Sequence, residues 1–314
     1  MVADVVASQA STPADDPICR AASYTMPRMP VKQASGRIPV IIGVGREAVA
    51  GAAGLACVLE ASAEKPGNIT PRHDFADTSY EDMLRSAIAL GPEIGRAGQR
   101  GVGDTVLAAV RATRRVTGAN TNLGIALLLG PLARAALTGT DVGEVLDELT
   151  LADAEAAYAA IRLAAPSGLD TPVEHDVRDA PRVTLREAMA AAADRDSIAA
   201  EYTNGFAVTY GIGLPALGHA LDAGLRPRDA VVELFLRLLA ELPDTLIARK
   251  RGSEAAERVS AGAGRVLAVG GARNRGAVAE LDASLRADGN ALNPGTTADL
   301  VTAALFVALL DGRL

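Results

Sequence analysis

The chain has 314 residues, which is long enough to bury a sizeable hydrophobic core as one large domain or as two small ones. Its net charge of -7 argues against a general nucleic-acid-binding protein, because such proteins usually present a basic face. Two cysteines, Cys19 and Cys57, are too few for a disulfide framework or a metal site, which favours a reducing compartment.

No segment has the length and composition of a membrane span. The longest apolar run, residues 300–310, is too short to cross a bilayer and predicts a buried core helix instead. Residues 1–20 lack the charged start and the long apolar core of a secretory signal. We therefore expect a cytoplasmic protein that binds neither membranes nor nucleic acid.

The first 45 residues differ from the rest of the chain. Residues 1–45 are rich in serine, proline and small polar residues and show no sustained period, which predicts a poorly ordered N-terminal extension. Within them, "IPVIIGVG" at residues 38–45 is either a short strand or the lead-in to the first helix.

From about residue 46 the hydrophobic pattern is helical almost throughout, and no alternating strand pattern recurs. The apolar residues are mostly alanine, leucine and valine, with 3% aromatics, and small side chains let helices pack closely. We predict helices at residues 46–63, 79–98, 103–118, 123–137, 142–164, 184–206, 228–242, 253–270, 274–288 and 296–310. The fifth of these is broken near Thr150, and the sixth divides into two helices.

The helix predicted at residues 123–137 is apolar nearly all round, so we expect it to lie at the centre of a bundle. The predicted fold is all-α. Residues 46–314 form a single-domain multi-helix bundle with a central apolar helix.

Five polar stretches interrupt the helices, at residues 65–75, 117–124, 167–179, 242–252 and 291–300. Each one has an ordinary structural explanation when it is taken alone. Proline and glycine punctuate loops, and an aspartate such as Asp153 or Asp299 stabilises a helix start. Arg249, Lys250 and Arg251 form a charged run that is typical of a solvated surface.

Taken together, the five stretches favour a phosphate-binding site. Backbone N–H groups at Gly-rich loops and helix starts bind phosphates, and so do lysine and arginine side chains. Mg²⁺ prefers a few carboxylates together with substrate phosphates, and Asp74, Asp244 and Asp299 are candidate ligands. The residues alone therefore indicate a helical enzyme that uses Mg²⁺ and a polyphosphate substrate.

Four of these stretches also resemble a known family. "LEASAEKPGNITPR", "TGANTNLG", "LPDTLIARKRG" and "NPGTTADL" occur in the order and approximate spacing of the triphosphoribosyl-dephospho-CoA synthase family, over roughly residues 47–312. The resemblance implies an all-helical fold and a transferase that moves the 5'-triphosphoribosyl group of ATP to the 2'-hydroxyl of 3'-dephospho-CoA, with release of adenine. It also implies that the product supplies the prosthetic group of an acyl carrier protein in citrate or malonate metabolism.

The family motifs carry over onto particular positions. The matching residues are Glu60, Lys65, Gly67, Arg72, Thr117, Gly118, Asn120, Thr121, Asp244, Thr245, Gly252, Pro294, Gly295, Ala298 and Asp299. Better-known members read Asn-Thr-His-Lys-Gly where this chain has Asn122 and Leu123 in place of the His and the Lys, and "LIARKRG" and "NPGTT" also depart from the family pattern. A branch of this kind occurs in archaea and in bacteria with archaeal-type one-carbon cofactors, which leaves the acceptor open.

Displacing adenine from C1' of ATP requires a clamp on the triphosphate, a base for the attacking hydroxyl and an acid near the leaving base. The predicted clamp is Lys65, Arg72, Arg249 and Lys250. Further nucleotide contacts are predicted from Gly67, Thr117, Gly118, Asn120, Thr121, Pro294 and Gly295.

The catalytic groups are less sharply defined by the sequence. Asp244 and Asp299 are the predicted Mg²⁺ ligands, and the base is either Glu60 or Asp74. His73 is either the acid or a solvated loop residue. The third polar stretch, which contains Glu174, His175 and Asp176, is predicted to be a lid or an acceptor contact.

Three functions compete. The first is the triphosphoribosyl transferase, with ATP as the donor and dephospho-CoA as the acceptor. The second is a related transferase in the biosynthesis of a one-carbon carrier such as tetrahydromethanopterin or methylofuran. The third is a non-catalytic nucleotide-binding helical protein. Release of adenine from ATP in the presence of dephospho-CoA separates the first from the others.

Overall fold

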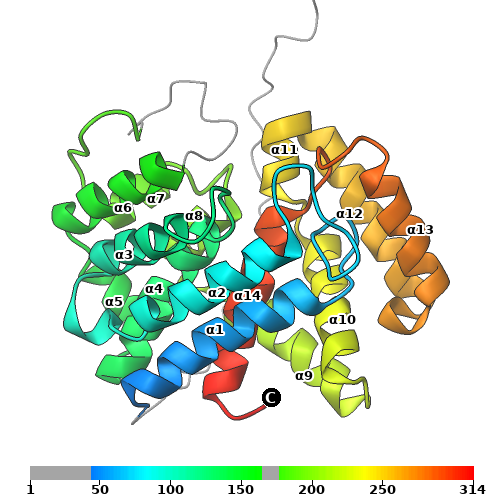
Figure 1. The fold of residues 1–314 in the computed structure, drawn as a ribbon, viewed down its shortest axis with the longest axis horizontal. Helices are drawn as coiled ribbons and strands as arrows, with labels where there is room; N and C mark the ends of the chain where they lie inside the picture. Colours follow the sequence, from blue (N-terminus) through cyan, green and yellow to red (C-terminus); the bar gives the residue numbers. More distant parts are fainter. Residues whose placement is uncertain (1–43, 165–176) are drawn as a thin grey trace, which may run out of the picture.

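The structure, a computed structural model, describes residues 44–164 and 177–314, and these ranges contain fourteen α-helices, α1 to α14 (Figure 1). The only β-type pairing in the same ranges is an isolated bridge between Thr70 and His73. The all-α prediction is therefore confirmed. The N-terminal extension, except for its last two residues, and residues 167–176 of the third polar stretch lie outside the described residues.

Helices α3 to α8 lie on one side of the molecule, drawn in cyan to green in Figure 1. Their bounds are α3 Val102–Arg114, α4 Leu123–Thr138, α5 Val142–Asp147, α6 Leu151–Ala164, α7 Leu185–Ala190 and α8 Ser197–Asn204. The predicted break near Thr150 is confirmed, because Thr150 Oγ1 accepts a hydrogen bond from the Asp153 N–H (3.2 Å) at the start of α6. The predicted division of residues 184–206 into two helices is also confirmed.

Helices α9 to α13 lie on the other side, drawn in yellow-green to orange. Their bounds are α9 Leu214–Asp222, α10 Pro227–Glu241, α11 Thr245–Arg251, α12 Ser253–Ala268 and α13 Arg275–Arg286, and a π-helical turn, η3 (Thr209–Gly213), leads into α9. The sequence predicts α10, α12 and α13 but not the short helices α9 and α11. Three consecutive basic residues end α11, so its seven residues carry too little apolar period to show a helix.

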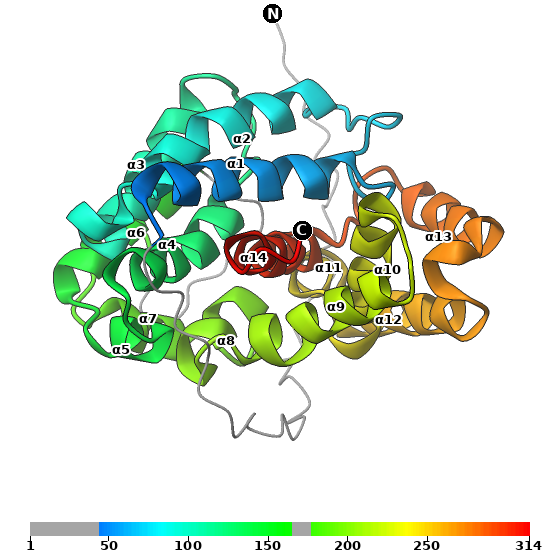
Figure 2. The ribbon, with the colours of Figure 1, turned by 90° about the horizontal axis from the view of Figure 1, so that it is seen from below.

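The first two helices, α1 (Arg46–Ser62) and α2 (Tyr80–Ile94), pack side by side and extend from one group of helices toward the other (Figures 1 and 2). A β-carbon at Gly91 of α2 would lie 2.7 Å from the carbonyl oxygen of Ala50 in α1, which is closer than such atoms can approach. The small residues of the sequence thus permit the close helix packing that was predicted.

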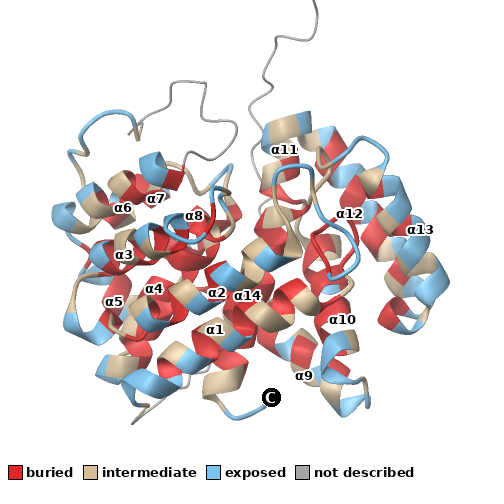
Figure 3. Cartoon of the chain, viewed as in Figure 1, coloured by how far each residue is buried: buried red, intermediate tan, exposed pale blue. Residues whose placement is uncertain are grey.

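The last helix, α14 (Gly295–Leu310), occupies the middle of the molecule (Figure 2). Twelve of its sixteen residues are buried, and it packs against α1, α4 and α10 (Figure 3). A central apolar helix is confirmed. The helix expected there, α4, also has twelve buried residues, but α14 is the one that lies between the two sides. In the two described ranges no helix is long and apolar enough to cross a membrane.

Candidate active site at four helix N-termini

The fourth and fifth polar stretches meet at Asp244, a buried residue that precedes α11. Asp244 Oδ1 accepts hydrogen bonds from the N–H groups of Leu246 (2.9 Å) and Ile247 (3.0 Å), which caps α11. Asp244 Oδ2 accepts from both the N–H (2.8 Å) and the hydroxyl (2.8 Å) of Thr297, in the first turn of α14. One carboxylate therefore joins the N-termini of two helices.

The N-terminus of α8 belongs to the same cluster. The Ser197 N–H of α8 donates to Thr245 Oγ1 of α11 (3.4 Å), and the Thr245 hydroxyl donates to Thr296 Oγ1 of α14 (3.2 Å). Asp196 caps α8, because its Oδ1 accepts from the Ile198 N–H (2.9 Å). The first turns of α8, α11 and α14 are thus connected by hydrogen bonds.

Helix α4 supplies the fourth N-terminus. A β-carbon at Gly124, the second residue of α4, would lie 2.1 Å from Asp299 Oδ2 of α14 and 2.7 Å from Ile198 Cδ1 of α8. Within the described part of the chain, the N–H groups of Gly124 and Ile125 have no hydrogen-bond acceptor. Because each helix start carries partial positive charge, and the start of α4 also has spare N–H groups, their convergence favours an anion such as phosphate.

The Asp299 carboxylate lies among these helix starts. It is partly exposed and forms no hydrogen bond or ion pair with any described residue. Burial by the surrounding protein raises the pKa of Asp299 well above its usual range, and the carboxylates of Glu60, Asp244 and Asp196 raise it further, while the Arg249 guanidinium opposes them. A carboxylate in this setting is stabilised by a cation or by a proton.

Helix α11 brings two of the predicted cations to the cluster. Arg249 Nη1 lies 3.7 Å from Asp196 Oδ2. Lys250 forms no hydrogen bond or ion pair with a described residue, and burial lowers its pKa, helped by the neighbouring Arg249 charge. The carboxylates of Asp77 and Asp244 raise the same pKa, so the Lys250 ammonium is within electrostatic reach of the loop between α1 and α2 and of the α11 cap.

Lys65, which the sequence places in the clamp, is fully buried. Its Nζ forms an ion pair with Glu60 Oε1 (3.0 Å) and donates to the backbone carbonyls of Glu60 and Ala63 at the end of α1. An ammonium group has three N–H donors, so this arrangement leaves none for a phosphate. A contact between Lys65 and substrate requires the pair to open, and the candidate base Glu60 is held in the same pair.

Gly67, in the loop between α1 and α2, contacts α13 and the residue before α14. Its φ of +73° is the left-handed conformation that favours glycine, and its N–H donates to Asp282 Oδ1 of α13 (2.8 Å). A β-carbon at Gly67 would lie 2.9 Å from Leu285 and 3.2 Å from Pro294 Cδ. The first and fifth polar stretches therefore touch where Gly295 begins α14.

Arg72, His73 and Asp74 are exposed on the same loop. Arg72 Nε donates to Glu64 Oε1 (3.0 Å), and Asp74 Oδ1 accepts from the Tyr80 N–H (2.7 Å) at the start of α2. Asp74 therefore acts as a helix cap in this structure. A catalytic role for His73 or Asp74 requires this part of the loop to move over the four helix starts.

The second polar stretch leads directly into α4. Asn120 Oδ1 accepts from the Leu123 N–H (3.4 Å), and Thr121 Oγ1 lies 2.5 Å from Ser86 Oγ of α2. The first bond caps the start of α4, and the second holds this start against α2.

Earlier in the second polar stretch, Thr117 is buried and Gly118 is exposed. Asn122 and Leu123, which depart from the family pattern, are both buried. Asn122 Nδ2 donates to Thr113 Oγ1 (2.8 Å), and Leu123 belongs to the hydrophobic core. Neither side chain presents a charge to the helix starts.

The residues fit Mg²⁺ in one way only. In the described part of the chain, no group of three His, Cys, Asp or Glu side chains is arranged to hold a metal ion. Asp244 already accepts four hydrogen bonds, which makes it a poor ligand, whereas the oxygens of Asp299 have no partner. Mg²⁺ often binds one or two carboxylates together with substrate phosphates and waters, and Asp299 fits that arrangement.

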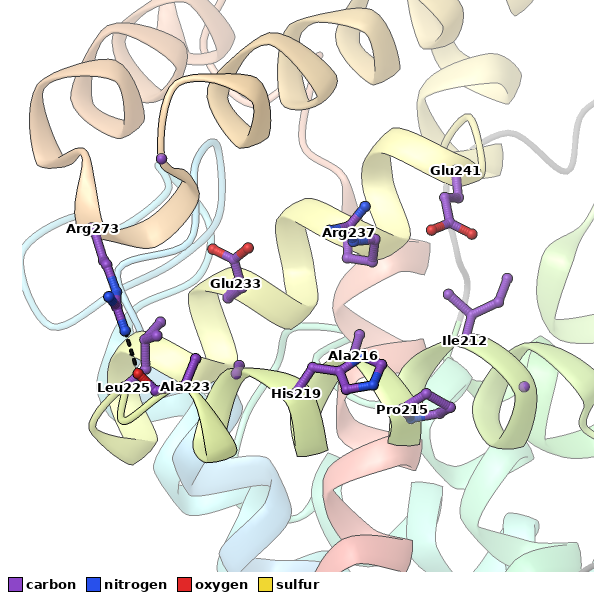
Figure 4. A pocket seen from close by; sticks show the side chains of 13 residues that line it. Ile212, Pro215, Ala216, His219, Ala223, Leu225, Glu233, Arg237, Glu241 and Arg273 are labelled. Carbon is purple, nitrogen blue, oxygen red and sulfur yellow. Dashed lines mark hydrogen bonds between the residues drawn. The ribbon is translucent and has the colours of Figure 1, made fainter.

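A hollow of about 450 Å³ lies elsewhere, between α9, α10 and the short helix η4 (Gly271–Arg273) (Figure 4). None of the predicted site residues lines it. Its ionisable lining residues are His219, Glu233, Arg237, Glu241 and Arg273. The lining contains two arginines and two glutamates, so it favours neither an anion nor a cation.

The fold and the converging helix starts define an all-α protein with a centre suited to a polyphosphate. The chain belongs to the family of ATP:dephospho-CoA triphosphoribosyl transferases (CitG), whose profile matches residues 46–314.

Individual relatives agree with this family. The 2-(5''-triphosphoribosyl)-3'-dephosphocoenzyme-A synthase of Klebsiella pneumoniae is 31% identical over 246 residues, which cover 76% of this chain and 77% of that protein. The protein of the same name from Pectobacterium atrosepticum is 32% identical over 188 residues, covering 59% of this chain and 57% of that protein. The crystal structure of a provisionally named triphosphoribosyl-dephospho-CoA synthase from Archaeoglobus fulgidus superposes with a TM-score of 0.58 at 29% identity, covering 73% of this chain and 99% of that chain.

Asp196 and Gly124 are among the residues of the cluster that sequence reasoning missed. The only sequence signal for Asp196 is its place at the start of the second helix within residues 184–206. Gly124 closes the stretch "TGANTNLG", but its contact with Asp299, 175 positions later in the chain, has no local signal.

Proposed function

We propose that this chain transfers the 5'-triphosphoribosyl group of ATP to the 2'-hydroxyl of 3'-dephospho-CoA and releases adenine. Membership of the transferase family supports the reaction class. The observation that carries the proposal is the convergence of the N-termini of α4, α8, α11 and α14 beside Arg249 and Lys250, because helix starts and cations together suit a triphosphate.

The chain's own groups hold the donor in place. In the reaction the bond from C1' of the ribose to adenine breaks, a bond from C1' to the acceptor oxygen forms, the acceptor hydroxyl loses a proton and adenine gains one. The N–H groups of Gly124 and Ile125, together with Arg249 and Lys250, bind phosphate oxygens and so fix C1' relative to the acceptor. Mg²⁺ bound with the triphosphate neutralises part of its charge, and Asp299 is the residue that would hold it.

The proton-transfer groups stay predictions. Glu60 lies within electrostatic reach of Asp299, which supports it as the base, but its pair with Lys65 must open first. Asp74 and His73 are on the exposed loop and need loop closure. A pH–rate profile of each variant, Glu60→Gln, Asp74→Asn and His73→Gln, distinguishes the three, because loss of the base removes the acidic limb of the profile and loss of the acid removes the alkaline limb.

An adenine-release assay tests the reaction. Purified protein is incubated with ATP and Mg²⁺, with and without dephospho-CoA, and free adenine is measured by chromatography. Adenine release that depends on dephospho-CoA supports the proposal. Tight ATP binding without any release under a range of acceptors indicates a nucleotide-binding protein instead.

A second acceptor is favoured by one observation. Asn122 and Leu123 are both buried and uncharged where better-known family members have His and Lys, so this chain lacks two ionisable side chains at the entry to α4. A related transferase in the biosynthesis of a one-carbon carrier is therefore the second candidate. Adenine release with a pterin or furan precursor, and not with dephospho-CoA, would select it.

We also propose that the reaction takes place in the cytoplasm, where ATP is supplied. Cell fractionation with an antibody against the chain tests this, and recovery of the protein outside the cytoplasmic fraction would contradict it.

A further inference from the structure

We propose that Gly124 is a positioning residue, whose missing side chain lets the Asp299 carboxylate sit at the N-terminus of α4, where the bound Mg²⁺–triphosphate needs it. The inference deepens the proposed function and rests on it for the identity of the ligand. The contact between the two residues is a separate matter, which can be tested without any turnover.

The space at Gly124 is filled by the aspartate. A β-carbon there would lie 2.1 Å from Asp299 Oδ2 and 2.6 Å from Asp299 Cγ, well inside the distance that real β-carbons keep from other atoms. Any larger residue at position 124 must displace the carboxylate or the helix that carries it. Because α14 is packed on several helices at the centre of the molecule, the carboxylate is the part that can move.

This contact differs from ordinary glycine packing in the same protein. At Gly91 and Gly103 the nearest atoms belong to the backbone of a neighbouring helix, so those glycines permit two helices to approach. At Gly124 the nearest atom is a carboxylate oxygen, and that carboxylate has no hydrogen-bond or ion-pair partner in the described residues. A side chain that packs for stability would be expected to have one.

The surroundings restrict where the carboxylate can go. Glu60, Asp196 and Asp244 all act on Asp299 as like charges, whereas the start of α4 offers the open N–H groups of Gly124 and Ile125. A carboxylate displaced by a β-carbon at position 124 therefore no longer lies beside these N–H groups, where the triphosphate is proposed to bind. Gly124→Ala should weaken binding of Mg²⁺ by the site in the same way as loss of the Asp299 carboxylate does.

A double-mutant cycle on Mg²⁺–ATP binding tests this, with wild type, Gly124→Ala, Asp299→Ala and the double variant measured by calorimetry at several Mg²⁺ concentrations. We expect each single variant to lose affinity by about tenfold or more, as changes next to a metal ligand typically do, and to need more Mg²⁺ for half-saturation. The double variant should lose no more than Asp299→Ala. Losses that multiply, or wild-type binding by Gly124→Ala, would overturn the proposal.

Two control variants separate positioning from packing. Gly264→Ala makes the same change inside α12, where a β-carbon meets nothing within 4 Å, and should leave binding unchanged. Ile198→Val removes the Cδ1 atom that also faces position 124, and adding it to Gly124→Ala should not restore Mg²⁺ binding. Recovery of binding in that double variant would assign the effect to Ile198 and overturn the role of Asp299.

Thermal unfolding of the same four proteins tests the contact even if the Gly124→Ala variant fails to fold. Replacing Asp299 with alanine frees the space that a β-carbon at position 124 needs. The double variant should therefore fold, with a melting temperature at or above that of Asp299→Ala. A double variant that also fails to fold would overturn the proposal. If wild type releases no adenine but the cycle holds, the proposed reaction is wrong and the Gly124–Asp299 contact stands. If wild type does not bind Mg²⁺–ATP, the positioning role is wrong, even where the melting cycle supports the contact between the two residues.

Discussion

At the scale of single residues, two aspartates that the sequence pairs as Mg²⁺ ligands have opposite surroundings. Asp244 accepts four hydrogen bonds from two helix starts, whereas Asp299 accepts none from the described residues. Burial raises the pKa of both carboxyl groups, but the hydrogen bonds to Asp244 favour its ionised form. Asp244 therefore holds the site together, and Asp299 is free to meet a ligand.

Asp244→Asn should lower the free energy of unfolding by roughly 2 kcal/mol or more, because an amide turns one acceptor atom into a donor that faces the N–H and hydroxyl groups of Thr297 or of the α11 cap. Urea unfolding measures the change. Asp299→Asn is the matched control and should show no such loss, since its carboxylate accepts no hydrogen bond from the described residues. Equal losses in the two variants would contradict the division of roles.

The raised pKa of Asp299 also predicts how stability depends on pH. The folded protein holds the Asp299 proton more tightly than the unfolded chain does, so this residue's contribution is greatest at low pH and is lost as pH rises from about 4, the usual aspartate value, to the folded pKa. Asp299→Asn removes this loss. The stability of the variant relative to wild type, measured by urea unfolding without Mg²⁺, should therefore grow above about pH 4 and then level off. A difference that stays constant with pH would refute the assignment.

At the scale of secondary structure, α11 is the element that turns a polar stretch into part of a site. Its start is capped by Asp244, and its last turn carries Arg249, Lys250 and Arg251, where the negative end of the helix dipole favours cations. Arg249 turns toward α8, whereas Arg251 pairs with Asp288 beyond the end of α13. One short helix therefore aims neighbouring charges in different directions.

Arg249→Ala and Lys250→Ala should each weaken Mg²⁺–ATP binding roughly tenfold, the usual effect of losing one charge-assisted contact. Stability should hardly change, because the 3.7 Å pair of Arg249 with Asp196 is of the weak, partly exposed kind. Calorimetric titration measures the affinity. Arg251→Ala, which removes the same charge from the same helix, is the control, and an equal loss there would mean that the helix contributes only general charge.

Elements with a long apolar period are predictable from the sequence, and short ones are not. The periods of α10, α12 and α14 locate these helices, but α9 and α11 are too short to show one. The sequence also selects Asp299, Arg249 and Lys250 as site residues, and the structure brings them close to the helix starts. It cannot tell that Lys65 is buried in a pair, because a lysine that caps a helix and a lysine that binds phosphate occupy the same kind of loop.

At the scale of the whole molecule, the fold is two groups of helices with α14 between them (Figure 2). Contacts between the polar stretches are made at the N-terminal end of this one helix, through Asp244, Gly124 and Gly67. The family profile begins at residue 46, where α1 also begins. The candidate site and the hydrophobic core therefore both lie within residues 46–314, the part of the chain that matches the family.

Deletion of residues 1–43 should leave both the melting temperature and Mg²⁺–ATP binding unchanged, because these residues precede the family match at residue 46. The deletion keeps Gly45, whose carbonyl accepts from the Val49 N–H (3.1 Å) at the start of α1. Differential scanning calorimetry and titration with ATP measure the two properties. A strongly lowered melting temperature would show that the first 43 residues contribute to the folded domain.

The position of α14 in the chain has a consequence for synthesis on the ribosome. Thirteen of the described helices leave the ribosome before α14 does. Until α14 arrives, the apolar faces that pack on it in the two groups of helices stay uncovered. Nascent chains of this protein thus carry exposed apolar surface for most of translation, which is the condition under which holding chaperones bind. The same order means that a chain stalled before residue 295 has no start of α14, and therefore neither a finished core nor the contacts of Asp244 and Gly124 with α14.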